Sequence, residues 1–288
     1  MCILVDEGTR VIVQGITGTV GSFQTKVMLD YGTKVVAGVT PGRGGQEAHG
    51  IPVYDLVEEA VEENGGDTAI LFVPGPFAAD AALEAIEAGV HLVVVTAEGV
   101  PTLDVMRVMR TAAERGVSVI GPDTAGLISP GKSKVGVHPH KLFREGRIGV
   151  VSKSGALSYE VSKALSEAGI GQSTVVGIGG GPMWGLTQVD ALELYERDDE
   201  TQGVVLLGEI GGTMEEEAAE YIRNNVSKPV VALIVGRYAP EGERMGHAGA
   251  IIEYGRGTAK GKIKALESAG VHVVADPREI PPYIKEVV

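Results

Sequence analysis

The chain has 288 residues, 44% of them hydrophobic, and a formal net charge of -13 at pH 7. This length is sufficient for one large or two ordinary domains with a sizeable core. The negative charge argues against nucleic acid or an anionic membrane as the main partner, because both would repel such a surface. A bound anion must therefore be held locally, by Arg or Lys side chains or by backbone N–H groups.

The features that mark export or membrane insertion are not found in the sequence. Its single cysteine, Cys2, cannot form an internal disulfide. No apolar run approaches the length of about 18 residues that a membrane span needs, and the N-terminus lacks the apolar region of a signal peptide. We therefore expect a cytoplasmic location.

Short Val- and Ile-rich runs, typical of buried parallel strands, alternate with stretches of helical length along the chain. The first series of predicted strands comprises residues 10–16, 33–39, 68–74, 91–97 and 117–122. The second comprises residues 147–152, 173–179, 202–210, 228–236 and 271–276, with helical stretches such as 213–225 between its later members. This alternation predicts an α/β chain of two doubly wound halves.

The segment between the two series is rich in Gly, Pro and Lys and follows neither period. We expect a linker there, at residues 126–146, joining a domain at 1–125 to a domain at 147–288. The linker contains GLISPGKS, which matches the phosphate-binding pattern of nucleotide hydrolases letter for letter. No helix is predicted directly after it, so we reject that assignment. His138 and His140 follow without further metal ligands nearby, and a surface loop is expected rather than a metal site.

The first predicted strand ends in GITGTVG, a glycine-rich turn that leads into a helix. Such a turn exposes backbone N–H groups at the positive end of the helix dipole and can bind phosphate. The second strand is followed by Arg43, with no acidic residue before Glu47. An NAD site needs an acid there, whereas a base suits the extra ribose phosphate of coenzyme A or NADP. The alternative is a turn made of glycines only for close packing.

Three features of the second half point to anion chemistry. Ser154 begins a helix after the first strand, either as a simple N-cap or as part of an anion site. Glu209 ends a parallel strand, where open α/β sheets bind ligands, although a solvated carboxylate is the alternative. His247 lies among small residues in GERMGHAGAIIEYG, either in a helix start that merely packs or in a loop that a bulky or charged group can approach. A carboxylate such as Glu209 could fix the tautomer of a histidine and leave its other ring nitrogen free to attack.

These motifs together resemble a known family. GITGTVG, TKVVAGVTPGRGG, TAEGVPTLD, SKSGALSYE, GEIGG and RMGHAGAI, in this order, resemble the α subunit of succinate–CoA ligase (succinyl-CoA synthetase) from residue 10 to about residue 275. The resemblance implies an N-terminal Rossmann-like CoA-binding domain and a flavodoxin-like ligase domain. It implies an acid–thiol ligase of the tricarboxylic acid cycle that works with a β subunit of the ATP-grasp type, as an αβ heterodimer or α2β2. Its substrates would be succinate and coenzyme A, with ATP or GTP and Mg2+ bound by the partner.

The same resemblance assigns roles to individual residues. His247 matches the phosphorylated histidine of the family, and Glu209 matches the carboxylate that orients it. Tyr159 matches a tyrosine of the substrate site. The helix start at Ser154, Gly155 and Ala156 matches a phosphate-holding helix. Coenzyme A contacts fall on Thr17, Gly18, Thr19, Val20, Arg43, Thr96, Ala97 and Glu98. No metal site is expected on this chain.

Some positions depart from the family pattern. Asp123, Thr124 and Ala125 stand where members usually read Asn, Cys and Pro, Arg43 replaces a more usual Lys, and residues 179–185 read GGGPMWG. These changes leave the phosphoryl chemistry in place but bear on the acyl substrate. The alternatives are therefore a related ligase that acts on malate or citrate, and a CoA-binding regulatory module, which would have no use for the RMGHAGAI motif.

Overall fold

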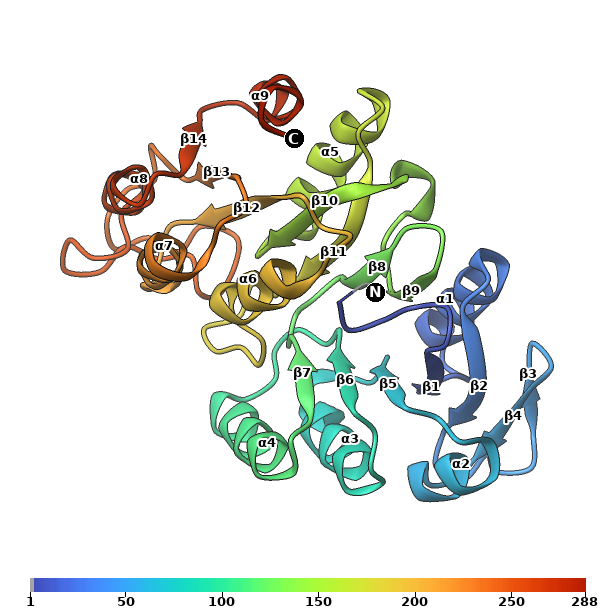
Figure 1. The fold of residues 1–288 in the computed structure, drawn as a ribbon. Coiled ribbons are helices and arrows are strands. Elements are labelled where there is room, and N and C mark those ends of the chain that lie inside the picture. The colour runs from blue at the N-terminus through green and yellow to red at the C-terminus, as the bar shows by residue number, and fades with distance from the viewer. Residues whose placement is uncertain (1–2) are drawn as a thin grey trace.

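The computed structural model describes residues 3–288, and Cys2 lies outside the described residues. The chain forms two α/β units, each built on a seven-stranded sheet (Figure 1). Within residues 3–288 no helix has both the length and the apolar character that a membrane crossing requires.

The sheet of the first unit has the strand order of a dinucleotide-binding fold. Its order is β3-β4-β2-β1-β5-β6-β7, and all pairs are parallel except β3 with β4. Without the short β3 this is the Rossmann order, so the predicted Rossmann-like domain is confirmed. The strands are β1 (Arg10–Gln14), β2 (Lys34–Val39), β3 (Glu47–Ala48), β4 (Ile51–Tyr54), β5 (Thr68–Leu71), β6 (Leu92–Val95) and β7 (Ser118–Ile120).

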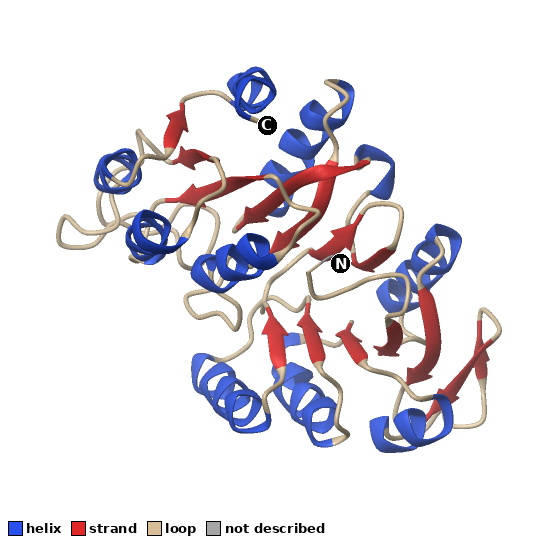
Figure 2. Cartoon of the chain, in the orientation of Figure 1, coloured by secondary structure: helices blue, strands red, loops and turns tan. Residues whose placement is uncertain are grey.

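Helices cover both faces of this sheet (Figure 2). Every residue of β5 and β6 is buried, as expected for strands packed on two sides. Left-handed glycines end several of the helices, and Gly32, at φ 100°, ends the first of them. The helices are α1 (Thr19–Tyr31), α2 (Val57–Asn64), α3 (Gly75–Glu87) and α4 (Thr102–Arg115).

The second sheet has the order β14-β13-β12-β10-β11-β8-β9. Its five parallel strands, β10 to β14, follow the flavodoxin order, which confirms the predicted flavodoxin-like domain. The strands are β8 (Gly126–Ser129), β9 (Ser133–Gly136), β10 (Glu145–Ser152), β11 (Gln172–Gly177), β12 (Gly203–Glu209), β13 (Val230–Val235) and β14 (His272–Val274). The helical segments are η1 (His140–Leu142), α5 (Gly155–Glu167), α6 (Gln188–Arg197), α7 (Met214–Asn225), α8 (Ala259–Ser268), η2 (Pro277–Glu279) and α9 (Ile280–Val287).

Residues 126–146, predicted as a linker, instead begin with a β-hairpin of the second sheet. Strands β8 and β9 are antiparallel to each other, and β8 pairs antiparallel with β11. The glycines that suggested a linker serve close strand packing, because a Cβ on Gly126 would lie 2.1 Å from the carbonyl oxygen of Val135. The hairpin also reaches the first unit, where Thr33 Oγ1 donates to the carbonyl of Lys134 at 2.9 Å (Figure 1). Two buried four-residue strands are too short to show a sequence period.

Candidate functional site

Both sheets present a switch point at the carboxyl ends of their strands, where open α/β sheets bind ligands. In the first sheet it lies between β1 and β5, and in the second between β10 and β12. The residues predicted to be functional follow these strands or their neighbours, so the two topologies place them at the carboxyl edges of the sheets.

The turn after β1 is shaped by glycines. Gly15 has φ 78°, and a Cβ on Gly21 would lie 2.1 Å from the carbonyl oxygen of Gly15, so no other residue fits at position 21. Helix α1 starts at Thr19 with Gly18 as its N-cap, without a side-chain cap and without an acid in its first turn. The predicted residues Thr17, Gly18, Thr19 and Val20 are all exposed. This helix start therefore presents uncapped amides to solvent, as an anion site requires.

The other predicted coenzyme A residues lie at the same edge of the sheet. Arg43 follows β2 in an exposed turn, in which its own N–H donates to Asp55 Oδ1 at 2.9 Å. Thr96 follows β6, and its hydroxyl donates to the carbonyl of Leu71 at 2.7 Å. Ala97 accepts from the N–H of Asp123 at 2.9 Å, which ties this segment to the end of the first unit, just before the chain enters the second. Glu98 is exposed and lines a cavity of about 300 Å³ between the units.

His247 and Glu209 are in direct contact. Glu209 is the last residue of β12, and His247 lies in the loop between β13 and α8, not in a helix. His247 Nδ1 is 2.8 Å from Glu209 Oε2. Because the Glu209 oxygen is the acceptor, the proton of the neutral imidazole lies on Nδ1, and Nε2 keeps its lone pair. The hydrogen bond to Glu209 raises the pKa of His247 above 6.5; partial burial opposes this shift, and the charge of Asp123 adds to it.

The small residues near His247 let three backbone segments meet. A Cβ on Gly180 would lie 2.5 Å from His247 Cγ, and one on Gly249 would lie 2.7 Å from the carbonyl oxygen of Gly181. A Cβ on Gly211, which has φ 92°, would lie 2.0 Å from the carbonyl oxygen of Gly249. The imidazole therefore lies against the Gly180 backbone, in a place that sequence reasoning did not identify.

The start of helix α5 is capped as the simpler sequence interpretation expected. Ser154 Oγ accepts from the N–H of Leu157 at 3.3 Å, and the N–H of Ser154 donates to Ser152 Oγ at 3.1 Å. The N–H groups of Gly155 and Ala156 occupy the first two helical positions, which have no intrahelical acceptor. Of the predicted phosphate-holding residues, these two have the donors suited to an anion.

Tyr159 is half-buried on α5, and a Cβ on Gly155 would lie 3.4 Å from its hydroxyl. Its ring packs edge-on against that of His138, with centroids 5.6 Å apart. His138 was expected in a surface loop, and this is wrong, because Tyr159 and Phe143 bury it to 1% exposure. Burial lowers the pKa of His138 to about 3, and the charge of Lys134 adds to this effect. Within residues 3–288 no three His, Cys, Asp or Glu side chains gather as metal ligands.

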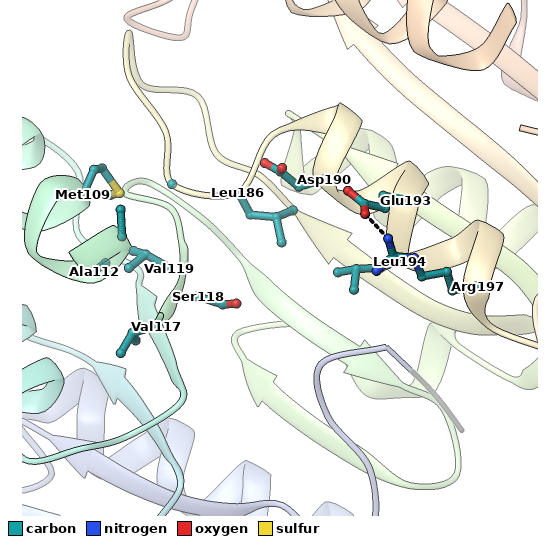
Figure 3. Close-up of a pocket in the computed structure, with 12 residues that line it drawn as sticks. Met109, Ala112, Val117, Ser118, Val119, Leu186, Asp190, Glu193, Leu194 and Arg197 are labelled. Atoms are coloured by element: carbon teal, nitrogen blue, oxygen red, sulfur yellow. Dashed lines mark hydrogen bonds and ion pairs between the residues drawn. The ribbon is translucent and has the colours of Figure 1, made fainter. Parts of the chain in front are cut away.

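The cavity of about 300 Å³ lies between the two units, and Ala248, the neighbour of His247 in the chain, is one of its lining residues. Glu98 and Asp123 line it from the first unit, and Met183, Arg244 and Ala248 line it from the second. The pKa of Asp123 is raised by burial and then by the charge of Glu98. Two departures from the family pattern, Asp123 and Met183, thus lie in the wall of this cavity. A separate cleft of about 400 Å³ lies between α4 and α6 and contains none of the predicted residues (Figure 3).

Comparison with known proteins agrees with this arrangement. A CoA binding domain model matches residues 6–99 and a CoA-ligase model matches residues 151–272. The chain is 58% identical to succinate–CoA ligase (ADP-forming) subunit alpha 1 of Archaeoglobus fulgidus, over 100% of this chain and 97% of that one. It is 53% identical to the corresponding α subunit of Aquifex aeolicus, over 97% of this chain and 92% of that one.

Among solved structures, ATP citrate lyase from Methanothrix soehngenii, in complex with citrate and coenzyme A, superposes with a TM-score of 0.89 at 27% identity. The match covers 99% of this chain and 52% of the lyase chain, so the present chain spans about half of that protein. The closer likeness to the ligase subunits extends over nearly their whole length and through both units. On that basis, the chain belongs to the family of succinate–CoA ligase α subunits.

Proposed function

We propose that this chain is the α subunit of a cytoplasmic acid–thiol ligase that joins succinate to coenzyme A through a phosphorylated His247. The observation that carries the proposal is the contact of His247 Nδ1 with Glu209 Oε2 at 2.8 Å, which directs the Nε2 lone pair away from the carboxylate. The family relatives are named ADP-forming succinate–CoA ligase α subunits, which supports succinate as the acid. ATP is accordingly favoured over GTP as the phosphoryl donor.

The reaction proceeds in three transfers. The Nε2 lone pair of His247 attacks the γ-phosphorus of the nucleotide, and the bond to the leaving nucleoside diphosphate breaks. A succinate carboxylate oxygen then takes the phosphoryl group, which gives succinyl phosphate and restores the imidazole. The thiolate of coenzyme A attacks the acyl carbon, and inorganic phosphate leaves. Covalent relay through histidine divides one difficult condensation into easier steps.

Residues of this chain have distinct tasks in these steps. Glu209 keeps the Nδ1 proton in place and stabilises the positive charge that the ring gains when Nε2 is phosphorylated. The N–H groups of Gly155 and Ala156, at the positive end of α5, are suited to hold phosphoryl oxygens. Nucleotide and Mg2+ are assigned to a β subunit of the ATP-grasp type, in an αβ or α2β2 assembly.

Coenzyme A is assigned to the first unit. The N–H groups of Thr19 and Val20, at the uncapped start of α1, are suited to its phosphates, and Arg43 supplies a cation. The N–H groups of Thr17 and Gly18 donate to Thr40 Oγ1 and to the carbonyl of Gly15, so these two residues would contact coenzyme A in other ways. Segment 96–98 leads from β6 to the cavity beside His247, which suits the acyl end of the molecule. Malate or citrate as the acid would act through the same phosphohistidine, so substrate assays decide between them and succinate.

The test is phosphoryl labelling of the complex purified with its partner subunit. Incubation with nucleoside triphosphate labelled at the γ position should give an acid-labile, base-stable phosphoprotein on this chain. His247→Asn should remove the label and Glu209→Gln should reduce it, whereas the exposed His91→Asn is a control that should keep it. If His247→Asn still takes up label and turns over, the proposed mechanism is wrong.

A further inference from the structure

A group of buried charges, Lys153, Glu215 and Lys262, lies next to the backbone of Glu209. Lys153 is 3% exposed, and Glu215 and Lys262 are completely buried. Each buried ion carries a desolvation cost of several kcal/mol, which only good pairing offsets, and an apolar cluster of similar volume would often be as stable. Such a group therefore suggests a use other than stability.

Glu215 accepts from both lysines and from the backbone of the catalytic strand. Its Oε1 is 3.0 Å from Lys153 Nζ and accepts from the N–H of Glu209 at 3.2 Å. Its Oε2 accepts from Lys262, which also donates to the carbonyl of Gly212 at 3.0 Å. Glu215 thus holds one end of the turn 209–212 directly and the other end through Lys262.

This turn requires left-handed backbone at two successive positions, and glycine occupies both. Gly211 and Gly212 have φ values of 92° and 58°, in the left-handed region. The orientation of the Glu209 carboxylate depends on this turn, because Glu209 is its first residue. Fixing both ends of the turn keeps Glu209 Oε2 directed at His247 Nδ1.

Lys153 connects the same carboxylate to the support of the imidazole ring. It follows β10 directly, and its ammonium lies 5.0 Å from the centre of the Trp184 ring. Trp184 Nε1 in turn donates to the carbonyl of Gly179 at 2.9 Å, next to Gly180, on which the His247 ring lies. The buried carboxylate of Glu215 is therefore connected to Glu209 directly, and through Lys153 to the start of α5 and to the Gly180 backbone against which the imidazole lies.

Helix α7 does not need Glu215 for its dipole alone. Two other acids, Glu216 and Glu217, stand in its first turn and can stabilise the N-terminus from positions nearer to solvent. Burial by itself raises the pKa of Glu215, but the charges of Lys153 and Lys262 lower it below its usual value, so the carboxyl is ionised at neutral pH.

We propose that Glu215, with Lys153 and Lys262, is the positioning group that fixes the Glu209 carboxylate and the Gly180 backbone at their positions next to the imidazole of His247. This inference rests on the proposed phosphohistidine function. The three residues act through Glu209 and Trp184 and are positioning residues, not catalytic ones.

The test compares variants of the complete α–β complex. Glu215→Gln leaves Lys153 without its carboxylate partner and Lys262 with Glu216 alone, at 3.0 Å. Because this change can unfold the unit, the double variant Glu215→Gln with Lys262→Met is made beside it. Lys134→Met, which removes an equally buried lysine far from Glu209 along the chain, is the matched control. The measurements are thermal unfolding, kcat and KM for coenzyme A, the pH profile of phosphohistidine formation, and the nitrogen-15 NMR signal of the Nδ1–H of His247.

We expect kcat of both cluster variants to fall about 10- to 100-fold, the loss that a displacement near 1 Å at a reacting group produces. KM for coenzyme A should be unchanged, because its phosphates are assigned to the other sheet. The Nδ1–H signal should broaden or shift, and the acid limb of the pH profile should move in the same direction as in Glu209→Gln. The control should keep the wild-type kcat, pH profile and signal.

Two outcomes overturn different claims. If the wild-type complex carries no label, or if His247→Asn keeps it, the proposed function fails regardless of the cluster variants. If labelling behaves as expected but the cluster variants lose only thermal stability, with the Nδ1–H signal and the pH profile unchanged, the cluster is purely structural and this inference is wrong.

Discussion

Gly180→Ala tests the arrangement around His247 with a single methyl group. The added Cβ would lie 2.5 Å from His247 Cγ and 2.6 Å from Cδ2. Because ordinary carbon contacts are about 3.5 to 4.0 Å, the imidazole must move by about 1 Å or more. Gly180 does not have a positive φ, so alanine itself is compatible with its backbone.

A displacement of about 1 Å at a reacting group costs on the order of 100-fold in rate. We therefore expect phosphohistidine formation to slow about 100-fold in rapid-quench labelling of the complex, with coenzyme A affinity unchanged. Gly181→Ala is the matched control, because its Cβ would lie 3.4 Å from the nearest atom, the carbonyl oxygen of Met183. Wild-type labelling by Gly180→Ala would show that the ring position is not required for the chemistry.

The remaining predictions concern pH and coenzyme A. Glu209 raises the pKa of His247 above 6.5, and the ring must be neutral to attack. Glu209→Gln should therefore move the acid limb of the pH profile of phosphohistidine formation to lower pH, as well as reduce the rate. An acid limb at the wild-type pH would contradict this. The pKa of buried His138 is lowered to about 3, so between pH 6.5 and 5 this imidazole becomes protonated in the unfolded chain but not in the folded one. The wild type should lose about 2 kcal/mol of stability over this interval that His138→Leu does not lose, measured by urea unfolding at both pH values. Arg43→Glu should weaken coenzyme A binding to the chain by about 1 to 3 kcal/mol in calorimetry, whereas the control Lys34→Glu, at another exposed position, should leave it unchanged. Equal affinities of wild type and Arg43→Glu would show that Arg43 does not contact coenzyme A.

The sequence by itself determined the architecture and the chemical types at the site. Alternation of buried strands with amphipathic helices is a local property, and it predicts two doubly wound halves. The same reasoning placed Glu209 at the end of a parallel strand and a glycine-rich turn, suited to phosphate, after β1. The proposed role of His247 came from the resemblance to the family, because no periodicity of the sequence indicates it.

The tertiary structure decided which side chains and backbone segments meet. His247 and Glu209 are 38 positions apart and touch only because the β13–α8 loop folds back over the end of β12. Glu215 was visible in the sequence only as one of three acids at a helix start, and nothing local distinguished the one that is buried between two lysines. The β8–β9 hairpin likewise depends on close approaches of glycine backbones. Such contacts depend on the meeting of distant segments, and that information is not contained in the periodicity of any single segment.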